Sequence, residues 1–382
     1  MSRRPRARAS RGRSHVGDRF EAEVGPVAHG GHCVVRHDDR VVFVRHALPG
    51  ERVVVSVTEG SEGDRFWRGD AVSVVLSSPD RVSAPCPYAG PGLCGGCDFQ
   101  HVSPAAQRTL KADVVREQLA RLAGIDRDVV VEEVPPLLRW RSRMRYVALP
   151  GGARGLHVHR SSEVVEIDDC LIDAGAAVPE VERVETSAGT RDFRVDPDGF
   201  WQSHLDAPRV LVEAVLGFLQ PRPGERVLDL YAGVGLFASF LADAVAASGS
   251  VVAVEGSRVA CRDARLNVPR SVQIEHGSVD RVLASAYDEQ FDLVVLDPPR
   301  EGARRTVVEQ IVDRAPRAVA YVACDPAALA RDLGTFAELG YALRDLRAFD
   351  LFPMTMHVEC VALLEMSADL RKHNAVRTSS VI

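Results

Sequence analysis

The chain has 382 residues, of which 46% are hydrophobic and 26% are charged, and its formal net charge is −6. This length and apolar content predict two or three domains with buried cores and exclude a chain that is disordered throughout. No apolar run approaches the roughly 20 residues of a membrane-spanning helix, and no hydrophobic stretch follows the arginine-rich start as it would in a secretory signal. We therefore expect a cytoplasmic protein without a membrane partner.

Positive charge is most concentrated at the N-terminus. Residues 1–13 contain six arginines and no acidic residue, so we expect residues 1–15 to form a basic flexible arm. Such an arm either adds nonspecific affinity for nucleic acids or only keeps the chain soluble. Arginine outnumbers lysine 45 to 2, which fits recognition of phosphate groups by guanidinium forks and equally fits a GC-rich genome.

Residues 16–79 have the pattern of a small β-barrel. Turn residues separate three apolar-rich segments, at 41–44, 51–57 and 71–75. Short strands at this spacing are typical of such barrels. The stretches 25–31 and 45–52 resemble the TRAM domain, an OB-like module that binds RNA, and we expect residues 16–79 to fold as this domain.

A helix is predicted between Ser103 and Gly124, because apolar residues recur at helical spacing and the glycine marks a stop. The chain then returns to a β pattern, with strands predicted at 154–159 and 164–167. We assign residues 80–97 and 125–197 to a central β-rich domain.

The C-terminal half alternates compact apolar strands with helical segments. The strands are predicted at 226–230, 251–254, 272–274, 293–296 and 318–322. This alternation predicts an α/β fold with a doubly wound parallel sheet. We assign residues 98–124 and 198–366 to this Rossmann-like domain, and residues 367–382 to a polar tail.

Residues 227–237 (VLDLYAGVGLF) are typical of a strand that runs into a glycine turn and a helix. Backbone amides and the helix N-terminus then face a ligand. Glu255 lies 20 residues after Gly235, where a carboxylate accepts hydrogen bonds from ribose hydroxyls. The glycine pattern alone fits a nicotinamide cofactor as well as S-adenosylmethionine. Asp229 favours S-adenosylmethionine, because an acid at the end of the first strand suits an ammonium group and repels a pyrophosphate.

Two reactive side chains follow later strands. Asp297 follows the strand at 293–296, which places its carboxyl group at the ligand edge of the sheet; the alternative is a proline-rich turn capped by aspartate. Cys324 lies in a polar turn after the strand at 318–322, where a thiolate is presented to a ligand. A buried cysteine with only a packing role is the alternative there.

Five motifs in order resemble the uracil-C5 RNA methyltransferases, the S-adenosylmethionine-dependent family that forms 5-methyluridine in ribosomal and transfer RNA. The resemblance covers nearly the whole chain. Its motifs are residues 200–203 (FWQS), 228–235 (LDLYAGVG), 297–300 (DPPR), 321–326 (YVACDP) and 352–359 (FPMTMHVE).

The resemblance implies roles for individual residues. Carbon C5 of uracil is a poor nucleophile until a thiolate adds at C6, and Cys324 would be that thiolate. Glu359 would remove the C5 proton after methyl transfer; the alternative is a surface carboxylate in a strand. The implied cofactor-binding residues are Gln202, Asp229, Tyr231, Gly233, Gly235, Glu255 and Asp297.

The chain departs from the family pattern at several positions. His204 replaces a frequent asparagine, Asp325 replaces the usual asparagine after the nucleophile, and Ala232 stands where cysteine is common. The segment 275–278, where an adenine-contacting acid or amide often lies, is also atypical. Asp325 matters most, because a negative charge beside Cys324 disfavours the thiolate.

Four cysteines, spaced Cys86-x7-Cys94-x2-Cys97 with a distant Cys170, form a candidate metal centre. Disulfides are rare in cytoplasmic proteins, whereas zinc and a [4Fe-4S] cluster both bind four thiolates. The spacing leaves these two open. The resemblance implies the [4Fe-4S] cluster, with zinc as the alternative.

Residues 139–146 (RWRSRMRY) interleave arginines with aromatic residues, a composition that suits phosphate contacts and base stacking. If this segment is a strand, one face carries Arg139, Arg141, Arg143 and Arg145, and we predict an RNA-binding surface there. A solvated sheet edge is the alternative.

The resemblance implies an RNA (uracil-C5-)-methyltransferase whose partner is an RNA substrate, with ribosomal RNA favoured over transfer RNA. We expect a monomer, and we expect the target uridine to be extruded into the site near Cys324. Two alternatives stay open, an NAD(P)-dependent oxidoreductase and an RNA-binding protein on an inactive methyltransferase scaffold.

Overall fold

The computed structural model describes residues 12–175 and 179–367. Contacts divide the chain into two compact units. Among the described residues, the first comprises 12–110, 145–171 and 353–356, and the second comprises 111–144, 172–175, 179–352 and 357–367. Residues 1–11 of the predicted arm and residues 368–382 of the predicted tail lie outside the described residues. In the described part of the chain, no helix has both the length and the apolar character to cross a membrane.

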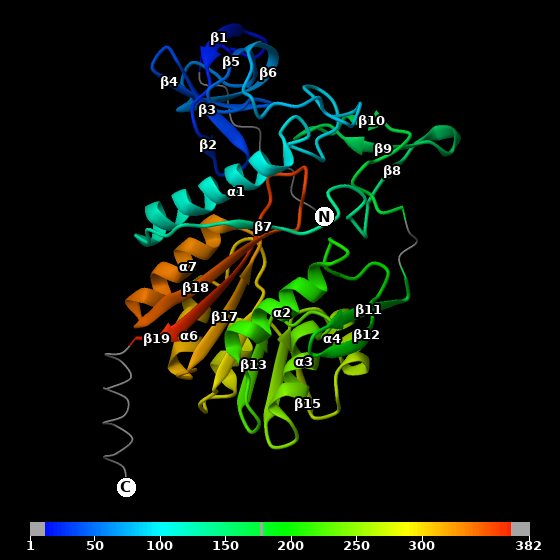
Figure 1. The fold of residues 1–382 in the computed structure, drawn as a ribbon, viewed down its shortest axis with the longest axis vertical. Helices are drawn as coiled ribbons and strands as arrows, with labels where there is room; N and C mark the ends of the chain where they lie inside the picture. The colour runs from blue at the N-terminus through cyan, green and yellow to red at the C-terminus, as the bar shows by residue number, and fades with distance from the viewer. Residues whose placement is uncertain (1–11, 176–178, 368–382) are drawn as a thin grey trace. The chain divides into compact units, whose positions relative to one another are not determined.

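The first unit contains the predicted barrel-like sheet (Figure 1). Its six described strands pair in the order β1 (Arg19–Glu23), β5 (Arg52–Glu59), β6 (Phe66–Leu76), β4 (Arg40–Arg45), β3 (His32–His37) and β2 (Val27–Ala28). Alternate residues of β5, namely Val53, Val55 and Val57, are buried, as the period of a half-buried strand requires. Strand β1 also contacts β3, so the sheet curls toward a barrel. The three strands predicted here are confirmed.

A second, small sheet in the first unit joins β10 (Val164–Glu166), β9 (Arg154–His157) and β8 (Val147–Ala148), with a short 3-10 turn, η2 (Pro150–Gly152), between β8 and β9. Contacts group it with the barrel-like sheet, while residues 125–144 and 172–197 group with the second unit. The predicted central domain of residues 80–97 and 125–197 therefore does not coincide with either compact unit.

The helix predicted between Ser103 and Gly124 is confirmed. It consists of α1 (Pro104–Gln118) and one π-helical turn, η1 (Leu119–Ala123). Gly124 ends it with a left-handed backbone, at φ 65°, and its N–H binds the carbonyl oxygens of Ala120 and Leu119. Glycine adopts this conformation without the steric cost that a Cβ atom brings.

The second unit is built on a mixed sheet. In its described part, eight strands pair in the order β15 (Val272–His276), β14 (Ser250–Glu255), β13 (Arg226–Leu230), β16 (Leu293–Leu296), β17 (Ala318–Ala323), β19 (Glu359–Met366), β18 (Tyr341–Asp350) and β7 (Val131–Glu133). The strands from β15 to β17 run parallel, which confirms the predicted parallel sheet. Strand β19 pairs antiparallel with both β17 and β18, and this part of the sheet was not predicted.

Helices cover both faces of this sheet (Figure 1), and each face has its own hydrophobic core. One core includes residues of α5 (Val279–Ser285), α6 (Arg304–Asp313) and α7 (Pro326–Glu338). The other includes residues of α2 (Ala207–Leu219) and α3 (Leu236–Val245). A hairpin of β11 (Val181–Thr186) and β12 (Gly189–Arg194) packs on α2 and on α4 (Arg258–Asn267). Strands buried on both faces explain the continuous apolar runs of the sequence.

Residues 139–145 do not form the strand on which the shared arginine face depended. The described backbone there makes only two isolated bridges, both at Arg141, to Asp173 and His204, and Arg139 has a positive φ of 59°. The amides of Arg141 and Ser142 bind the carbonyl oxygens of Ile172 and Ser203, so they hold two loops instead of a neighbouring strand. The alternation that would place four arginines on one face is therefore absent from this segment.

A buried ion pair joins α1 to the end of β18 in the second unit. The Lys111 ammonium donates to Asp350 Oδ1 at 2.5 Å and to the Phe352 carbonyl oxygen at 3.0 Å. The two side chains are 0% and 3% exposed. A buried charge left without its partner is costly, so this contact fixes where residues 350–352 leave the sheet.

We predict that Lys111→Met lowers the free energy of unfolding by about 3 kcal/mol, because it leaves the Asp350 carboxylate buried and unpaired. Urea unfolding followed by circular dichroism measures this. The control is Arg305→Met, which breaks an exposed pair with Glu309 and should cost less than about 1 kcal/mol. Equal losses of unfolding free energy in Lys111→Met and Arg305→Met would contradict the stabilising role assigned to the buried ion pair.

Candidate active site

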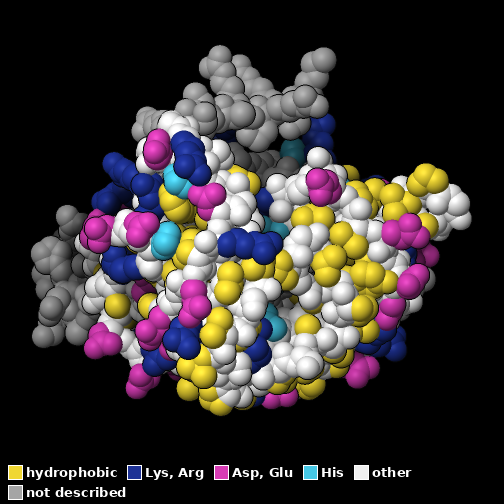
Figure 2. Space-filling model, turned by 90° about the horizontal axis from the view of Figure 1, so that it is seen from above, with side chains coloured by type: hydrophobic (Ala, Val, Ile, Leu, Met, Phe, Trp, Pro, Cys, Tyr) yellow, Lys and Arg dark blue, Asp and Glu magenta, His cyan; other side chains and the backbone are white. Residues whose placement is uncertain are grey.

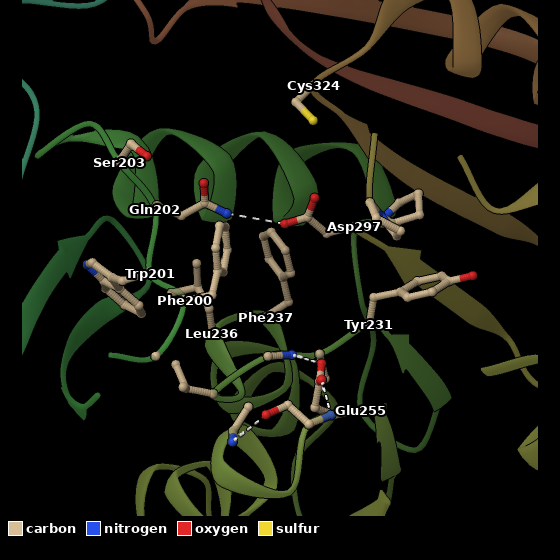
Figure 3. A pocket seen from close by; sticks show the side chains of 18 of the residues that line it. Phe200, Trp201, Gln202, Ser203, Tyr231, Leu236, Phe237, Glu255, Asp297 and Cys324 are labelled. Atoms are coloured by element: carbon tan, nitrogen blue, oxygen red, sulfur yellow. Dashed lines mark hydrogen bonds between the residues drawn. The ribbon is translucent and has the colours of Figure 1, made fainter. Parts of the chain in front are cut away.

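A cavity of about 560 Å³ opens at the carboxyl edge of the parallel strands in the second unit. The carboxyl ends of β13, β14, β16 and β17 meet at this edge, where open α/β sheets bind ligands. Figure 3 shows the side chains that line it. Seven predicted site residues line the cavity: Gln202, Tyr231, Gly233, Glu255, Asp297, Cys324 and Glu359.

The glycine turn follows β13 as predicted. Tyr231, Gly233 and Gly235 all have positive φ angles, of 62°, 55° and 86°. At Gly235 a Cβ atom would lie 2.5 Å from Val268 Cγ1, so the turn approaches the end of α4 too closely for any side chain. Gly235 itself does not line the cavity; it starts α3 beneath the cavity.

Asp229 also lies below the cavity and not in its lining. It is 1% exposed, and its Oδ2 accepts a hydrogen bond of 2.8 Å from the Ala238 amide of α3. Its Oδ1 has no partner among the described residues. Burial raises the pKa of Asp229 to about 8, with help from the negative charges of Asp297 and Glu255 and against the lowering effect of the Ala238 hydrogen bond. The residue therefore holds the glycine turn and α3 together.

Glu255 holds the glycine turn from the side of β14. Its Oε2 accepts from the Gly233 amide at 2.9 Å, and its Oε1 accepts from the Ser257 amide at 2.6 Å. Each carboxylate oxygen has a second lone pair for a ligand hydroxyl. In Figure 3 Glu255 lies at the opposite end of the cavity from Cys324, so an elongated ligand fits between them.

Gln202 and Asp297 point toward each other across the cavity (Figure 3). The Gln202 Nε2 donates to Asp297 Oδ2 at 3.2 Å. Burial raises the pKa of Asp297 to about 7, against the lowering effect of this hydrogen bond. The contact joins the loop before α2 to the end of β16, two segments 95 residues apart.

Cys324 and Glu359 are neighbours because of strand pairing. Ala323, the last residue of β17, pairs with Cys360 of β19. Because the two strands are antiparallel, Cys324 after Ala323 and Glu359 before Cys360 lie at the same edge, and both line the cavity. Burial, followed by the charges of Glu359 and Asp297, raises the pKa of the Cys324 thiol to about 12. Burial and Asp297 raise the pKa of Glu359 well above its usual range. Cys324, Glu359 and Asp297 all become negatively charged when they ionise, so a charge on one disfavours ionisation of the others.

Arg300 is the positive charge beside these groups. It lowers the pKa values of both Cys324 and Glu359, although burial outweighs it. Its guanidinium lies 3.3 Å from His357 Nε2, and burial together with Arg300 lowers the pKa of His357 to about 4. A neutral His357 accepts from Arg300 and orients it. Both residues lie inside the quoted motifs, but neither was among the predicted catalytic or cofactor-binding residues.

Two of the departures from the family pattern, Asp325 and His204, have structural explanations. Asp325 caps α7, because its Oδ1 accepts from the Ala328 amide at 2.8 Å; it raises the pKa of Cys324 as predicted, but it contributes less than burial, Glu359 and Asp297 do. His204 is 1% exposed and stacks on Trp140, with ring centroids 5.8 Å apart. The segment 275–278 does not line the cavity.

All four predicted metal-binding cysteines lie in the first unit, and none of them forms a disulfide with a described residue. The charge of Cys170 raises the pKa values of both Cys94 and Cys97, after the larger effect of burial, so these thiols are neighbours. Among the described residues, however, no three His, Cys, Asp or Glu side chains are grouped closely enough to hold a metal ion. The donor types fit a thiolate-bound metal, but the grouping does not confirm the predicted centre.

The predicted arginine surface is dispersed. Arg143 donates to the carbonyl oxygens of Asp196, Pro197 and Gly199, and Arg139 donates to that of Asp173. Arg145 belongs to the first unit and the other three to the second. Figure 2 shows acidic side chains interspersed with arginines on the face viewed there. Arg143 is therefore a structural group rather than an exposed RNA contact.

Comparison with known proteins identifies the family. The family model described as tRNA (Uracil-5-)-methyltransferase matches residues 181–367, and the TRAM domain model matches residues 13–72. An uncharacterized RNA methyltransferase of Streptomyces avermitilis is 45% identical, over 92% of this chain and 99% of its own length. The chain belongs to the RNA methyltransferases of the tRNA (uracil-5-)-methyltransferase family.

Further similarities agree with this family. An uncharacterized RNA methyltransferase of Bifidobacterium longum is 36% identical, over 90% of this chain and 96% of its own length. The fold is similar to that of the Pyrococcus abyssi tRNA (uracil-54, C5)-methyltransferase in complex with S-adenosyl-L-homocysteine, with a TM-score of 0.67, 22% identity, and coverage of 90% of this chain and 99% of that one. Membership leaves the oxidoreductase alternative without support.

For this RNA methyltransferase we predict that Arg300→Gln slows alkylation of Cys324 by iodoacetamide at pH 9, because loss of the positive charge raises the pKa of the thiol further. Arg300→Lys keeps the charge and should react nearly as fast as the original chain. Mass spectrometry of the peptide that contains Cys324 separates it from the other cysteines. Faster alkylation of Arg300→Gln would contradict the assigned electrostatics.

Proposed function

We propose that this protein transfers a methyl group from S-adenosylmethionine to carbon C5 of a uridine in RNA. The observation that carries the proposal is the meeting of a thiol, Cys324, with the carboxyl groups of Asp297 and Glu359 at one edge of the sheet. Carbon methylation of uracil needs a nucleophile for C6 and a base for C5, and these are the residue types present.

The cavity suits a cationic nucleoside cofactor. Bound S-adenosylmethionine supplies an electrophilic methyl group on a positively charged sulfur. Burial raises the pKa values of Asp297 and Glu359, and a positive ligand would favour their ionised forms. Glu255 would accept from ribose hydroxyls, while Gln202, Tyr231, Gly233 and Asp297 would surround the rest. Asp229 and Gly235 would act from below by shaping the turn.

Cys324 would add to C6 of the target uracil, which raises electron density at C5. A thiol with a pKa near 12 is protonated at neutral pH, so its proton must leave as the bond forms. The carboxylate of Asp297 would accept this proton, which leaves the carboxylate of Glu359 free for the later step. After the methyl group has joined C5, Glu359 would remove the remaining C5 proton, and the thiolate would leave as the ring double bond re-forms.

The substrate is proposed to be RNA whose target base leaves its stack to reach Cys324. The TRAM domain matched at residues 13–72 supports RNA binding. Ribosomal RNA is our proposed class, by resemblance, and transfer RNA is the alternative. Mapping of 5-methyluridine in RNA from cells with and without the gene decides between them.

We further propose that Cys86, Cys94, Cys97 and Cys170 bind a [4Fe-4S] cluster, with zinc as the alternative. Support comes from their resemblance to the family's cluster ligands, from their location in one unit, and from the proximity of Cys170 to Cys94 and Cys97. Four thiolates would supply the complete ligand set of such a cluster. The proposed role is structural, since these residues lie outside the catalytic unit.

We predict that the purified protein forms 5-methyluridine in unmodified RNA with S-adenosylmethionine, and that Cys324→Ala lowers the rate at least 1,000-fold. Glu359→Gln should block release, so that an RNA adduct accumulates on denaturing gels. Nucleoside analysis by mass spectrometry measures the product. RNA binding with no methylated uridine in any RNA would instead favour the inactive scaffold.

We predict about four iron atoms per chain in anaerobically purified protein, and a loss of most of this iron in Cys97→Ser. Metal analysis and visible absorption measure both quantities. Cys33→Ser is the control, because Cys33 is buried in β3 and donates to the Ala47 carbonyl oxygen. One zinc per chain under the same conditions would overturn the iron assignment.

A further inference from the structure

Helix α4 contacts two separate walls of the cavity in the second unit. One wall is the glycine turn after β13. The other is the segment of residues 194–203, which leaves β12 and carries Phe200, Trp201 and Gln202 into the cavity lining. These walls lie far apart in sequence, and neither belongs to α4.

The Asn267 side chain at the end of α4 joins the two walls. Its Nδ2 donates to the Val234 carbonyl oxygen of the glycine turn at 3.0 Å and to the Arg194 carbonyl oxygen at 2.9 Å. Its Oδ1 accepts from the Arg194 amide at 2.8 Å. Asn267 is buried, so each of these contacts replaces one that water would otherwise make. Only a carboxamide combines these donors and this acceptor in one short side chain.

Two other side chains hold the segment beyond Arg194. Asp263 of α4 accepts from the Asp196 amide at 2.9 Å, and Arg143 binds the carbonyl oxygens of residues 196, 197 and 199. Neither of these residues reaches the glycine turn by a described hydrogen bond. The turn has its own supports, the Glu255 carboxylate and the backbone contact of Ala232 with Val254. Among the described contacts, the Asn267 carboxamide is therefore the hydrogen-bonding link between the two walls.

We propose that Asn267 is a positioning residue that sets the spacing between the glycine turn and the segment carrying Gln202. The inference rests on the proposed function, because the spacing matters for methyl transfer only if the cofactor lies on the turn and the target base lies near Gln202 and Asp297. Loss of the Asn267 side chain should leave the glycine turn intact and make residues 194–203 more mobile. The cavity should then still bind the cofactor, but the position of Gln202 should no longer be fixed.

Hydrogen exchange and S-adenosylhomocysteine binding test this without RNA. In Asn267→Ala, amide exchange should rise at least tenfold in residues 194–203 and stay unchanged in the parallel strands, while the Kd of S-adenosylhomocysteine changes less than threefold. Leu266→Ala is the matched control, since Leu266 is the preceding residue of α4 and is 64% exposed. Unchanged exchange in residues 194–203 would overturn the proposal, as would a rise spread over the whole unit.

Kinetics give the second readout. Asn267→Ala should lower kcat for 5-methyluridine formation at least tenfold relative to Leu266→Ala. In the double variant Asn267→Ala with Gln202→Ala, kcat should fall little further than in the more impaired single variant. Both substitutions act through the Gln202 side chain, so their effects should not add. If the losses of kcat in the two single variants multiply fully in the double variant, the proposal is overturned.

If Asn267→Ala does not fold, Asn267→Ser replaces it, because serine retains one hydrogen-bond donor. Its amide exchange should rise about threefold in residues 194–203 and stay unchanged in the parallel strands. If the unsubstituted protein forms no 5-methyluridine, the proposed function is contradicted, but the hydrogen-exchange test of Asn267 still applies.

Discussion

The antiparallel pairing of β19 with β17 is the constraint on which the rest of the site depends. Ala323 pairs with Cys360 in this antiparallel ladder. Cys324, which follows Ala323, and Glu359, which precedes Cys360, therefore enter one cavity. A slip of one residue would turn every side chain of β19 to the other face of the sheet. The buried apolar residues of β19, such as Val361 and Leu364, prevent this slip. Hydrophobic packing on the two faces thereby fixes the distance between the proposed nucleophile and base.

This arrangement has an electrostatic cost. Burial of Asp297, Cys324 and Glu359 at one edge raises all three pKa values, and Arg300 offsets only part of the effect. Perturbed groups in a cleft of this kind are typical of functional sites. The same groups would bind a positively charged cofactor well, since a cation relieves their mutual repulsion.

Much of this was predictable from sequence because the signals were local. Strands β14, β16 and β17 contain continuous apolar runs, and the glycine turn and the cap at Gly124 need particular residues. Asp297 and Cys324 could be placed on one sheet edge by their positions after strands, and their meeting there follows from the parallel order of those strands. Gln202 and Glu359 could be named only from the resemblance.

The remaining features depend on long-range contacts that no local pattern encodes. Residues 139–145 alternate like a strand, yet their amides bind loops about 30 and 60 residues away. The domain prediction did not anticipate that residues 145–171 group with the barrel-like sheet. Asn267 and Lys111 looked like ordinary helix residues, and only the fold reveals their buried partners. Asp229 was predicted to touch the cofactor, but it lies one layer below.

The central claim is that sulfur of Cys324 bonds to the uracil ring during methyl transfer, and RNA containing 5-fluorouridine tests it most directly. Fluorine replaces the C5 proton that Glu359 would remove, so the covalent intermediate cannot resolve. With S-adenosylmethionine present, we expect mass spectrometry to find the methylated fluorouridine attached to the peptide that contains Cys324. A chain that turns over unmodified RNA but yields no adduct, or yields one at another residue, would contradict the account.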